Sequence, residues 1–152
     1  MLHVPRESGC IVEYGPGVGT ITFELLKRLR RDGILIAIEQ NPGFVEFLRE
    51  NAVDPRLQVY KGSAEDVLKI LPLLGIAQVD CVVSGIPYST IAARTRDTIL
   101  RNSRAVLREG GTFLVYQFTS TVAPHMREVF GTVHEELEFR NFLPARIFSA
   151  RT

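Results

Sequence analysis

Short apolar runs alternate with amphipathic stretches along the chain, and this alternation predicts strands separated by helices. The run at residues 10–14, for example, is followed by a stretch at 20–31 in which apolar residues recur at helical spacing. The expected strands are 10–14, 34–39, 57–61, 79–84 and 112–118, and the expected helices are 20–31, 42–51, 64–71, 90–109 and 123–130.

Glycine and capping residues mark the ends of these helices. Gly33 is expected to end the first helix, Asn41 to cap the second, and Gly110 with Gly111 to close the fourth. Spacing within the first two helices predicts that the following side chains face the core: Phe23, Leu26, Leu29, Phe44, Phe47 and Leu48.

Two further apolar runs, 133–139 and 145–149, close the chain and are separated by too few residues for a crossover helix. They must therefore pair antiparallel. The predicted fold class is α/β: a Rossmann-like, doubly wound, seven-stranded sheet, mostly parallel, with an antiparallel C-terminal edge hairpin. In such sheets a ligand binds at the carboxyl ends of the strands, so the turns that follow the strands are the places to look for chemistry.

The composition is that of an ordinary globular protein: 152 residues, 45% hydrophobic and 23% charged, which favours a single domain over residues 1–152. No apolar run approaches the ~20 residues that a membrane-spanning helix needs, and no secretory signal is visible, so a cytoplasmic location is expected. The net charge of +1 does not by itself point to a nucleic-acid or membrane partner, so such a partner must be read from a local patch. Cys10 and Cys81 form no CxxC pair, so no metal site is predicted.

The most specific motif follows the first strand, where Gly15, Gly17 and Gly19 occupy alternate positions before a helix. Glycines let the backbone turn sharply and approach a ligand, and the helix start presents unpaired N–H groups. A dinucleotide-binding fingerprint would place its third small residue at Thr20, so that assignment fits poorly. The alternative is a tight turn that binds no ligand.

The acidic residue followed by GxGxG resembles the first motif of class I S-adenosylmethionine-dependent methyltransferases, and the resemblance extends over nearly the whole chain. It implies S-adenosyl-L-methionine as the cofactor. It also implies that Glu13 reaches the methionine amino group and that the glycine backbone, with Tyr14 and Pro16, lines the methionine and adenosine parts.

A second carboxylate, Glu39, ends the second strand about twenty residues after Gly19. At this position it can accept hydrogen bonds from both ribose hydroxyls, and Gln40 and Asn41 are expected to line the same pocket. Taken alone, Glu39 would be read as a solvated carboxylate at a strand end.

After the third strand the family usually has an acidic residue that accepts from the adenine amino group, and here that position is Ser63. The Ser63 hydroxyl, the Ala64 N–H or a displaced Glu65 could serve instead. Glu65 and Asp66 are equally well explained as favourable charges in the first turn of a helix.

The fourth strand ends at Ser84, expected at the cofactor, and Gly85-Ile86-Pro87-Tyr88 follows it. An aromatic residue beside a proline-fixed loop suits amine chemistry. The rRNA adenine dimethylases have Asn-Leu-Pro-Tyr here, whereas Ser-Gly-Ile-Pro is similar to bacterial phospholipid N-methyltransferases. We expect Tyr88, Pro87 and Gly85 to face the transferred methyl group; the alternative for Tyr88 is a packed aromatic. Residues 115–119 and 140–146 also resemble the lipid-modifying family.

The resemblance implies transfer of a methyl group to the amine of a phosphatidylethanolamine-like head group. One alternative is methylation of adenine in rRNA or another nucleic acid, and a different class is a cofactor-binding module without catalysis. Related methyltransferases carry upstream helices that this chain is expected to lack. The sequence names neither a general base nor an oligomeric state.

Basic residues align along the expected helix 90–109, where Arg94, Arg101 and Arg108 share its outer face. A solvated surface explains them, and so does peripheral contact with an anionic membrane; nucleic acid is a less favoured partner.

Overall fold

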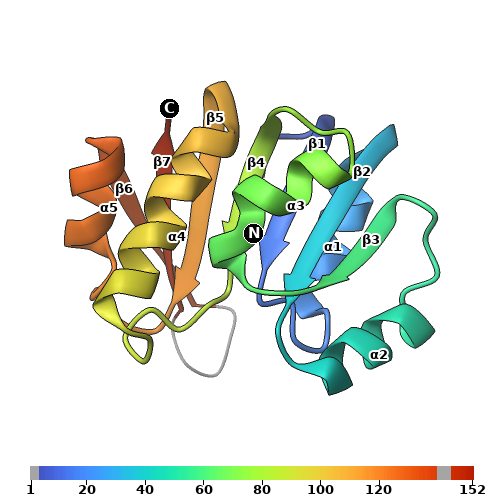
Figure 1. The fold of residues 1–152 in the computed structure, drawn as a ribbon. Helices are drawn as coiled ribbons and strands as arrows, with labels where there is room; N and C mark the ends of the chain where they lie inside the picture. The colour runs from blue at the N-terminus through green and yellow to red at the C-terminus, as the bar shows by residue number, and fades with distance from the viewer. Residues whose placement is uncertain (1–3, 140–144) are drawn as a thin grey trace.

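The computed structural model describes residues 4–139 and 145–152, and all strands of this part of the chain form one sheet (Figure 1). The sheet order is β3-β2-β1-β4-β5-β7-β6, and β1 to β5 are parallel while β7 runs antiparallel to both of its neighbours. This confirms the predicted fold class. The strands are β1 Ser8–Tyr14, β2 Leu29–Glu39, β3 Leu57–Lys61, β4 Val79–Ser84, β5 Leu107–Gln117, β6 Val133–Glu138 and β7 Ala145–Arg151.

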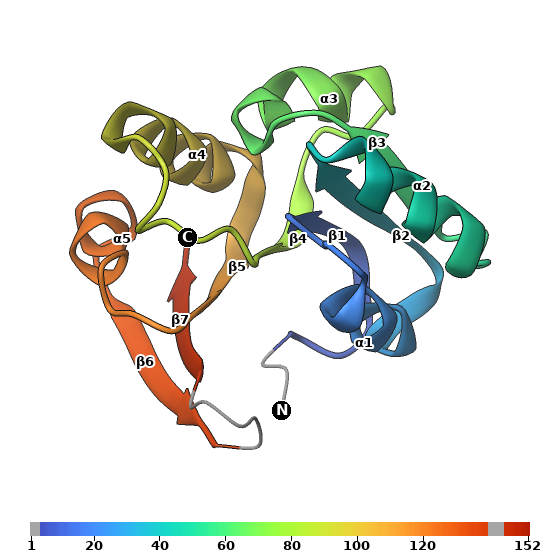
Figure 2. The same ribbon diagram turned by 90° about the horizontal axis from the view of Figure 1, so that it is seen from below.

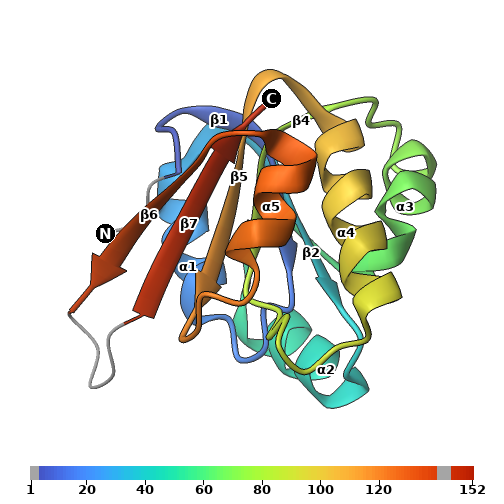
Figure 3. The same ribbon diagram turned by 90° about the vertical axis from the view of Figure 1, so that its left-hand side faces the viewer.

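Helices cover both faces of the sheet. Figure 3 shows α3, α4 and α5 together on one face, with α1 on the other. Among the described residues no helix has the length and hydropathy needed to cross a membrane. The helices are α1 Thr20–Arg28, α2 Pro42–Asn51, α3 Val67–Leu73, α4 Ala93–Val106 and α5 Ala123–Phe130, and a 3₁₀ turn, η1, covers Ala64–Asp66 before α3.

Alternating strand residues fill the two cores. In β1, Ile11 packs with Leu25 of α1, whereas Val12 belongs to the larger cluster that includes Ile99 of α4. Successive strand side chains point to opposite faces, so a strand covered on both sides reads as a continuous apolar run. The same division continues through β2, β4 and β5, which explains the uninterrupted hydrophobic runs in these segments.

The end of the first helix was predicted wrongly. α1 ends at Arg28, and Gly33 lies inside β2 instead of closing the helix. The chain becomes extended at Leu29 because this side chain is buried beside β1. Pairing with β1 then jumps from Leu29 to Ile34, so residues 30–33 form an irregularity within the strand.

The long helix is shorter than expected at both ends. It begins at Ala93 because the N–H and hydroxyl of Thr90 both donate to the Pro87 carbonyl in a turn that precedes the helix. It ends at Val106, and Gly110 and Gly111 lie within β5.

The prediction that Arg94, Arg101 and Arg108 share one helix face is therefore wrong for Arg108. Arg94 and Arg101 lie on α4, but Arg108 belongs to β5 and forms an ion pair with Asp80.

Three aromatic side chains predicted to face the core are partly exposed: Phe23, Phe44 and Phe47. In α2 the buried residues are Val45 and Leu48, one turn apart, so the apolar face is rotated relative to the prediction. Phe118, expected at the end of a strand, lies outside β5 and is 68% exposed. The stretch 140–144, part of the lipid-family resemblance, lies outside the described residues.

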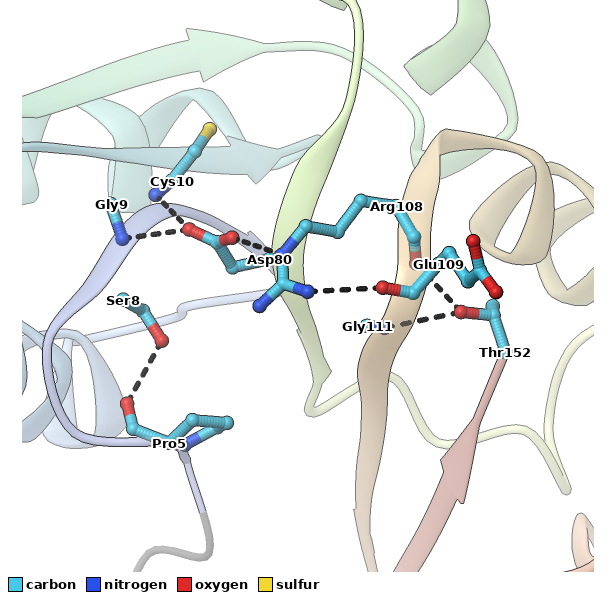
Figure 4. A network of polar contacts seen from close by, with 9 residues as sticks. All are labelled: Pro5, Ser8, Gly9, Cys10, Asp80, Arg108, Glu109, Gly111 and Thr152. Atoms are coloured by element: carbon cyan, nitrogen blue, oxygen red, sulfur yellow. Dashed lines mark hydrogen bonds and ion pairs between the residues drawn. The ribbon is translucent and has the colours of Figure 1, made fainter.

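A polar network fixes the amino ends of the strands (Figure 4). The Asp80 carboxylate accepts from the N–H groups of Gly9 at 2.7 Å and Cys10 at 2.8 Å, and from Arg108 Nε at 2.5 Å. Burial alone would raise the pKa of Asp80, but the Arg108 and backbone hydrogen bonds outweigh it and lower the pKa. Thr152 Oγ1 extends the network by accepting from the Gly111 N–H and donating to the Arg108 carbonyl.

Candidate active site

A cavity of about 330 Å³ opens at the opposite edge of the sheet, where β1 and β4 send their connections in opposite directions. Figure 2 views the molecule from this carboxyl edge. Such a reversal of strand order is where open α/β sheets bind ligands, and the volume suits a nucleoside-sized group. The cavity is lined by Gly15, Gly17, Ile38, Glu39, Gln40, Phe44, Gly62, Ser63, Ala64, Gly85, Ile86, Pro87, Ile91, Thr95 and Ile99.

The glycine loop forms one wall and uses backbone conformations that other residues avoid. Gly15, Gly17 and Gly19 all have positive φ, at 66°, 56° and 86°. A side chain on Gly15 would lie 3.3 Å from Ile86 Cγ1, whereas one on Gly17 would meet no atom within 4 Å. The loop therefore leaves room for a ligand at Gly17. Pro16 and Gly19, both predicted cofactor contacts, shape the loop from outside the cavity: the Gly19 N–H donates to the Pro16 carbonyl.

Glu39 joins this loop to the second strand. Its carboxylate accepts from the Gly17 N–H at 3.1 Å and from the Asn41 N–H at 2.9 Å, and the side chain is only 8% exposed. The structure brings Glu39 and Gln40 to the cavity wall, while Asn41 caps α2 by accepting from the Gly43 N–H. A buried carboxylate that lines a cavity and holds only two backbone donors retains acceptor capacity for ligand hydroxyls.

Glu13 and Tyr14, also predicted at the cofactor, are buried behind the wall and do not line the cavity. Glu13 accepts from the Thr22 hydroxyl at 2.7 Å. Burial raises the pKa of Glu13 to about 7, the Thr22 hydrogen bond opposes this rise, and the charge of Glu39 adds to it. The Tyr14 hydroxyl accepts from Ser103, and burial raises the pKa of Tyr14.

The segment after β3 contributes Ser63 and Ala64 to the cavity. The Ser63 hydroxyl accepts from the Glu65 N–H at 3.2 Å and so caps the short turn η1. The Glu65 side chain does not line the cavity, and its carbonyl accepts from the Asn102 amide. Of the three expected contacts after the third strand, two therefore reach the site.

The loop after β4 lies directly beside the glycine loop, where the Gly85 N–H donates to the Tyr14 carbonyl, and its Gly85 and Pro87 line the cavity. Tyr88 is only 1% exposed and is not among the lining residues. Its hydroxyl is hydrogen-bonded to Ser84 Oγ at 2.9 Å, and burial raises its pKa. Both side chains lie in the protein interior, which matches the packed-aromatic alternative for Tyr88.

Several residues that line the cavity were not predicted from the sequence. Ile91, Thr95 and Ile99 line the cavity at intervals of four residues, an arrangement that places them on one side of α4 and its approach. That spacing is a signal the sequence offered. Phe44 also reaches the cavity, which accounts for the partial exposure of its ring.

The cavity lining combines apolar surface that can contact a flat ring, hydroxyls and backbone groups that can bond to the edges of that ring, and one carboxylate. Among the described lining residues, Glu39 is the single ionisable side chain. These are the features that an adenosine moiety needs, namely apolar contact for the base and an acceptor for the ribose hydroxyls. The residues present therefore fit the cofactor that the motif implied.

Comparison with known proteins agrees with this geometry. The family described as "Methyltransferase domain" matches residues 11–111. The ornithine lipid N-methyltransferase of Singulisphaera acidiphila is 31% identical over 152 residues, which cover 98% of this chain and 79% of that protein. The protein named probable ribosomal RNA small subunit methyltransferase A of Methanosphaera stadtmanae is 30% identical over 83 residues, 55% of this chain and 28% of that protein.

The fold is also shared with solved structures. The crystal structure of Aeropyrum pernix fibrillarin, in complex with natively bound S-adenosyl-L-methionine, aligns with a TM-score of 0.73 at 16% sequence identity. The match covers 99% of this chain and 70% of that one. The resemblance drawn from the glycine motif is thus confirmed, and with it S-adenosylmethionine as the cofactor. The chain belongs to the family of S-adenosylmethionine-dependent methyltransferases.

Proposed function

We propose that the protein N-methylates an amine on the head group of a membrane lipid of the phosphatidylethanolamine kind. The observation that carries this proposal is the loop after β4, whose Gly85 and Pro87 line the cavity beside the glycine loop. Gly85 stands where adenine dimethylases have asparagine, so the side-chain carbonyl that would hold an adenine amine is absent. A relative named for N-methylation of an amine-bearing lipid supports the same class of acceptor.

The cofactor supplies a methyl group on a positively charged sulfur, which leaves as a neutral thioether. The chain's own residues do the positioning. Glu39 and the backbone at Gly17 would hold the nucleoside end, and Ile91 and Thr95 would pack against the base. We assign Glu13 to the methionine end of the cofactor, as the motif implies. Because its carboxylate is buried behind the glycine loop, its ionised form would act on the amino group from behind this loop and not as part of the cavity wall.

The acceptor amine must attack as the neutral base, because its lone pair forms the new carbon–nitrogen bond. The product ammonium then loses a proton to solvent or buffer. Since Glu39 is engaged with backbone N–H groups, we assign no general base to this wall. Catalysis rests on proximity and alignment of the two reactants.

The test is transfer of labelled methyl from S-adenosylmethionine to vesicles of phosphatidylethanolamine, vesicles of ornithine lipid, and RNA in parallel. We expect label in the lipid amine and loss of transfer in Glu39→Ala, with Glu46→Ala on the exposed surface of α2 as the matched control. Label found in RNA alone would reject the lipid assignment and favour adenine methylation, the second candidate, which the ribosomal RNA methyltransferase relative supports. Cofactor binding without transfer to any acceptor would favour a binding module.

Contact with an anionic membrane surface is part of the proposal, through Arg94 and Arg101 of α4. Each arginine near such a surface contributes about 1 kcal/mol. Co-sedimentation with vesicles that contain phosphatidylglycerol should weaken in the double variant Arg94→Glu, Arg101→Glu. Unchanged sedimentation would remove α4 from the membrane contact.

A further inference from the structure

Gln117, the last residue of β5, connects the end of the sheet to the loop that faces the acceptor. Its side chain is 7% exposed, and each end of the amide is used. Oε1 accepts from the Tyr88 N–H at 3.3 Å, while Nε2 donates to the Ile86 carbonyl at 2.5 Å and to the Tyr116 carbonyl at 2.8 Å. One amide therefore holds the loop on both sides of Pro87.

These bonds decide which loop carbonyls remain available. The Ile86 carbonyl is engaged by Gln117, and the Pro87 carbonyl accepts from the Thr90 N–H and hydroxyl. Within residues 4–139 and 145–152, the Gly85 carbonyl has no hydrogen-bond donor, and Gly85 lines the cavity. A carbonyl without a donor beside a cavity is an acceptor for an incoming N–H group.

Gln117, whose amide holds the loop at residues 85–88, is itself held in the sheet. Gln117 pairs with Arg146 of β7 in the register of the sheet, and Val115, two residues earlier in β5, pairs with Ser84 at the end of β4. The loop is thus fixed to the central sheet from a strand that lies beside it. A buried amide with three good partners costs little to bury, whereas an apolar replacement would leave the Tyr88 N–H and the Ile86 carbonyl unpaired.

We propose that Gln117 is a positioning residue for methyl transfer: it fixes the loop at residues 85–88 so that the Gly85 carbonyl orients the acceptor amine. This inference rests on the proposed function for the nature of the amine. It adds a role for a residue that makes no contact with the cofactor cavity. A misplacement of about 1 Å at such a loop can lower the rate about 100-fold.

The test compares Gln117→Leu and Gln117→Glu with Gln58→Glu, a control on the exposed surface of β3. Gln117→Leu should lower kcat for transfer to the lipid amine about 10- to 100-fold and leave cofactor affinity, measured by calorimetry, within about twofold. In the same variant the Tyr88 amide should exchange with solvent about tenfold faster, while the Thr90 amide, which donates to Pro87, stays as in the wild type. The control should change none of these quantities.

Gln117→Glu supplies a readout that a purely packing role would not move. Ionised, its carboxylate faces two carbonyl oxygens and repels them; protonated, it can again donate to Ile86 and accept from Tyr88. The ratio of variant to wild-type kcat should therefore rise as pH falls. If Gln117→Leu fails to fold, the pH dependence of this kcat ratio in Gln117→Glu still tests the positioning role of Gln117.

A wild-type kcat and unchanged Tyr88 exchange in Gln117→Leu would overturn the proposal, as would a pH-independent ratio in Gln117→Glu. Failure of the proposed function looks different, because the wild-type protein would then transfer no methyl group to either lipid. The exchange measurement needs no methyl acceptor. Even if the protein methylates no lipid, unchanged Tyr88 exchange in Gln117→Leu would show that Gln117 does not fix the loop.

Discussion

Glu39 shows how one side chain can serve the fold and the ligand together. Its carboxylate holds the N–H groups of Gly17 and Asn41, so it pins the glycine loop to the start of α2 while it faces the cavity. A ligand hydroxyl must share these oxygens with backbone donors, which a carboxylate with about four acceptor positions allows. The residue therefore shapes the wall, and in the proposed function it also accepts from the ligand.

Replacing Glu39 by alanine should weaken binding of S-adenosylhomocysteine by about 1–3 kcal/mol, because the ribose hydroxyls lose their acceptor. Isothermal calorimetry measures this directly, with Glu46→Ala as the surface control. Unchanged affinity in Glu39→Ala would show that the ribose lies elsewhere.

The raised pKa of Glu13 predicts that folding stability and cofactor affinity change with pH in opposite directions. Its pKa rises from 4.5 in the unfolded chain to about 7 in the fold, so folding binds a proton in this interval and stability falls as pH rises through it. Cofactor affinity should run the other way, because only the ionised carboxylate attracts an amino group.

Urea unfolding between pH 5 and pH 8 checks the first trend, and calorimetry over the same range checks the second. Gln at this position can still accept from Thr22, so Glu13→Gln should abolish this residue's contribution to both pH trends. A wild-type stability that rises from pH 5 to pH 8 as much as that of Glu13→Gln would contradict the raised pKa.

At the scale of elements, Gly19 is the point where α1 and α2 meet. A side chain there would lie 2.7 Å from Leu48 Cδ2 and 3.1 Å from Phe23 Cε2, and the backbone has a φ of 86°. A Cβ at this position would force the Leu48 and Phe23 side chains to shift, so the glycine allows the start of α1 and the buried face of α2 to pack closely.

Gly19→Ala should lower the free energy of unfolding by more than the ~1–2 kcal/mol that a left-handed alanine costs. The matched control is Gly75→Ala, which has a φ of 71° but no atom within 4 Å of the added Cβ. Chemical denaturation should place Gly19→Ala below Gly75→Ala. Equal losses would mean that α2 moves aside at no cost.

The order of elements could be predicted from the sequence because strands covered on both faces read as apolar runs and a short final connection forces antiparallel pairing. Element ends could not: Leu29 and Leu107 become extended because the sheet buries them, a tertiary effect invisible to helical spacing. At the site, the glycine loop and Glu39 follow from a local motif. The wall of Phe44, Ile91 and Thr95 depends on how α2 and α4 are placed against the sheet.

At the scale of the whole molecule, stability and chemistry occupy opposite edges of the sheet. The Asp80 network ties β1, β4 and β5 at their amino ends (Figure 4). The cavity lies at the carboxyl ends of the parallel strands. A change at one edge should leave the other intact, since no lining residue belongs to the Asp80 network.

Asp80→Ala should lower the free energy of unfolding by about 1–3 kcal/mol, because the N–H groups of Gly9 and Cys10 lose their acceptor. Affinity for S-adenosylhomocysteine should stay within about twofold of the wild type. Thermal or urea denaturation measures the free energy of unfolding, and calorimetry measures the affinity. A loss of affinity as large as the loss of stability would show that the two edges are coupled.

Part of the cavity lining is main chain, at Gly15, Gly17 and Gly85, while the part from α4 and the residues before it is made of side chains. These two parts of the lining differ in how easily mutation can change them. Substitutions at Ile91 and Thr95, which are only partly buried, would reshape the cavity directly, whereas Ile99 also packs in the larger core cluster. A change in the glycine-lined part would require the backbone itself to be rebuilt.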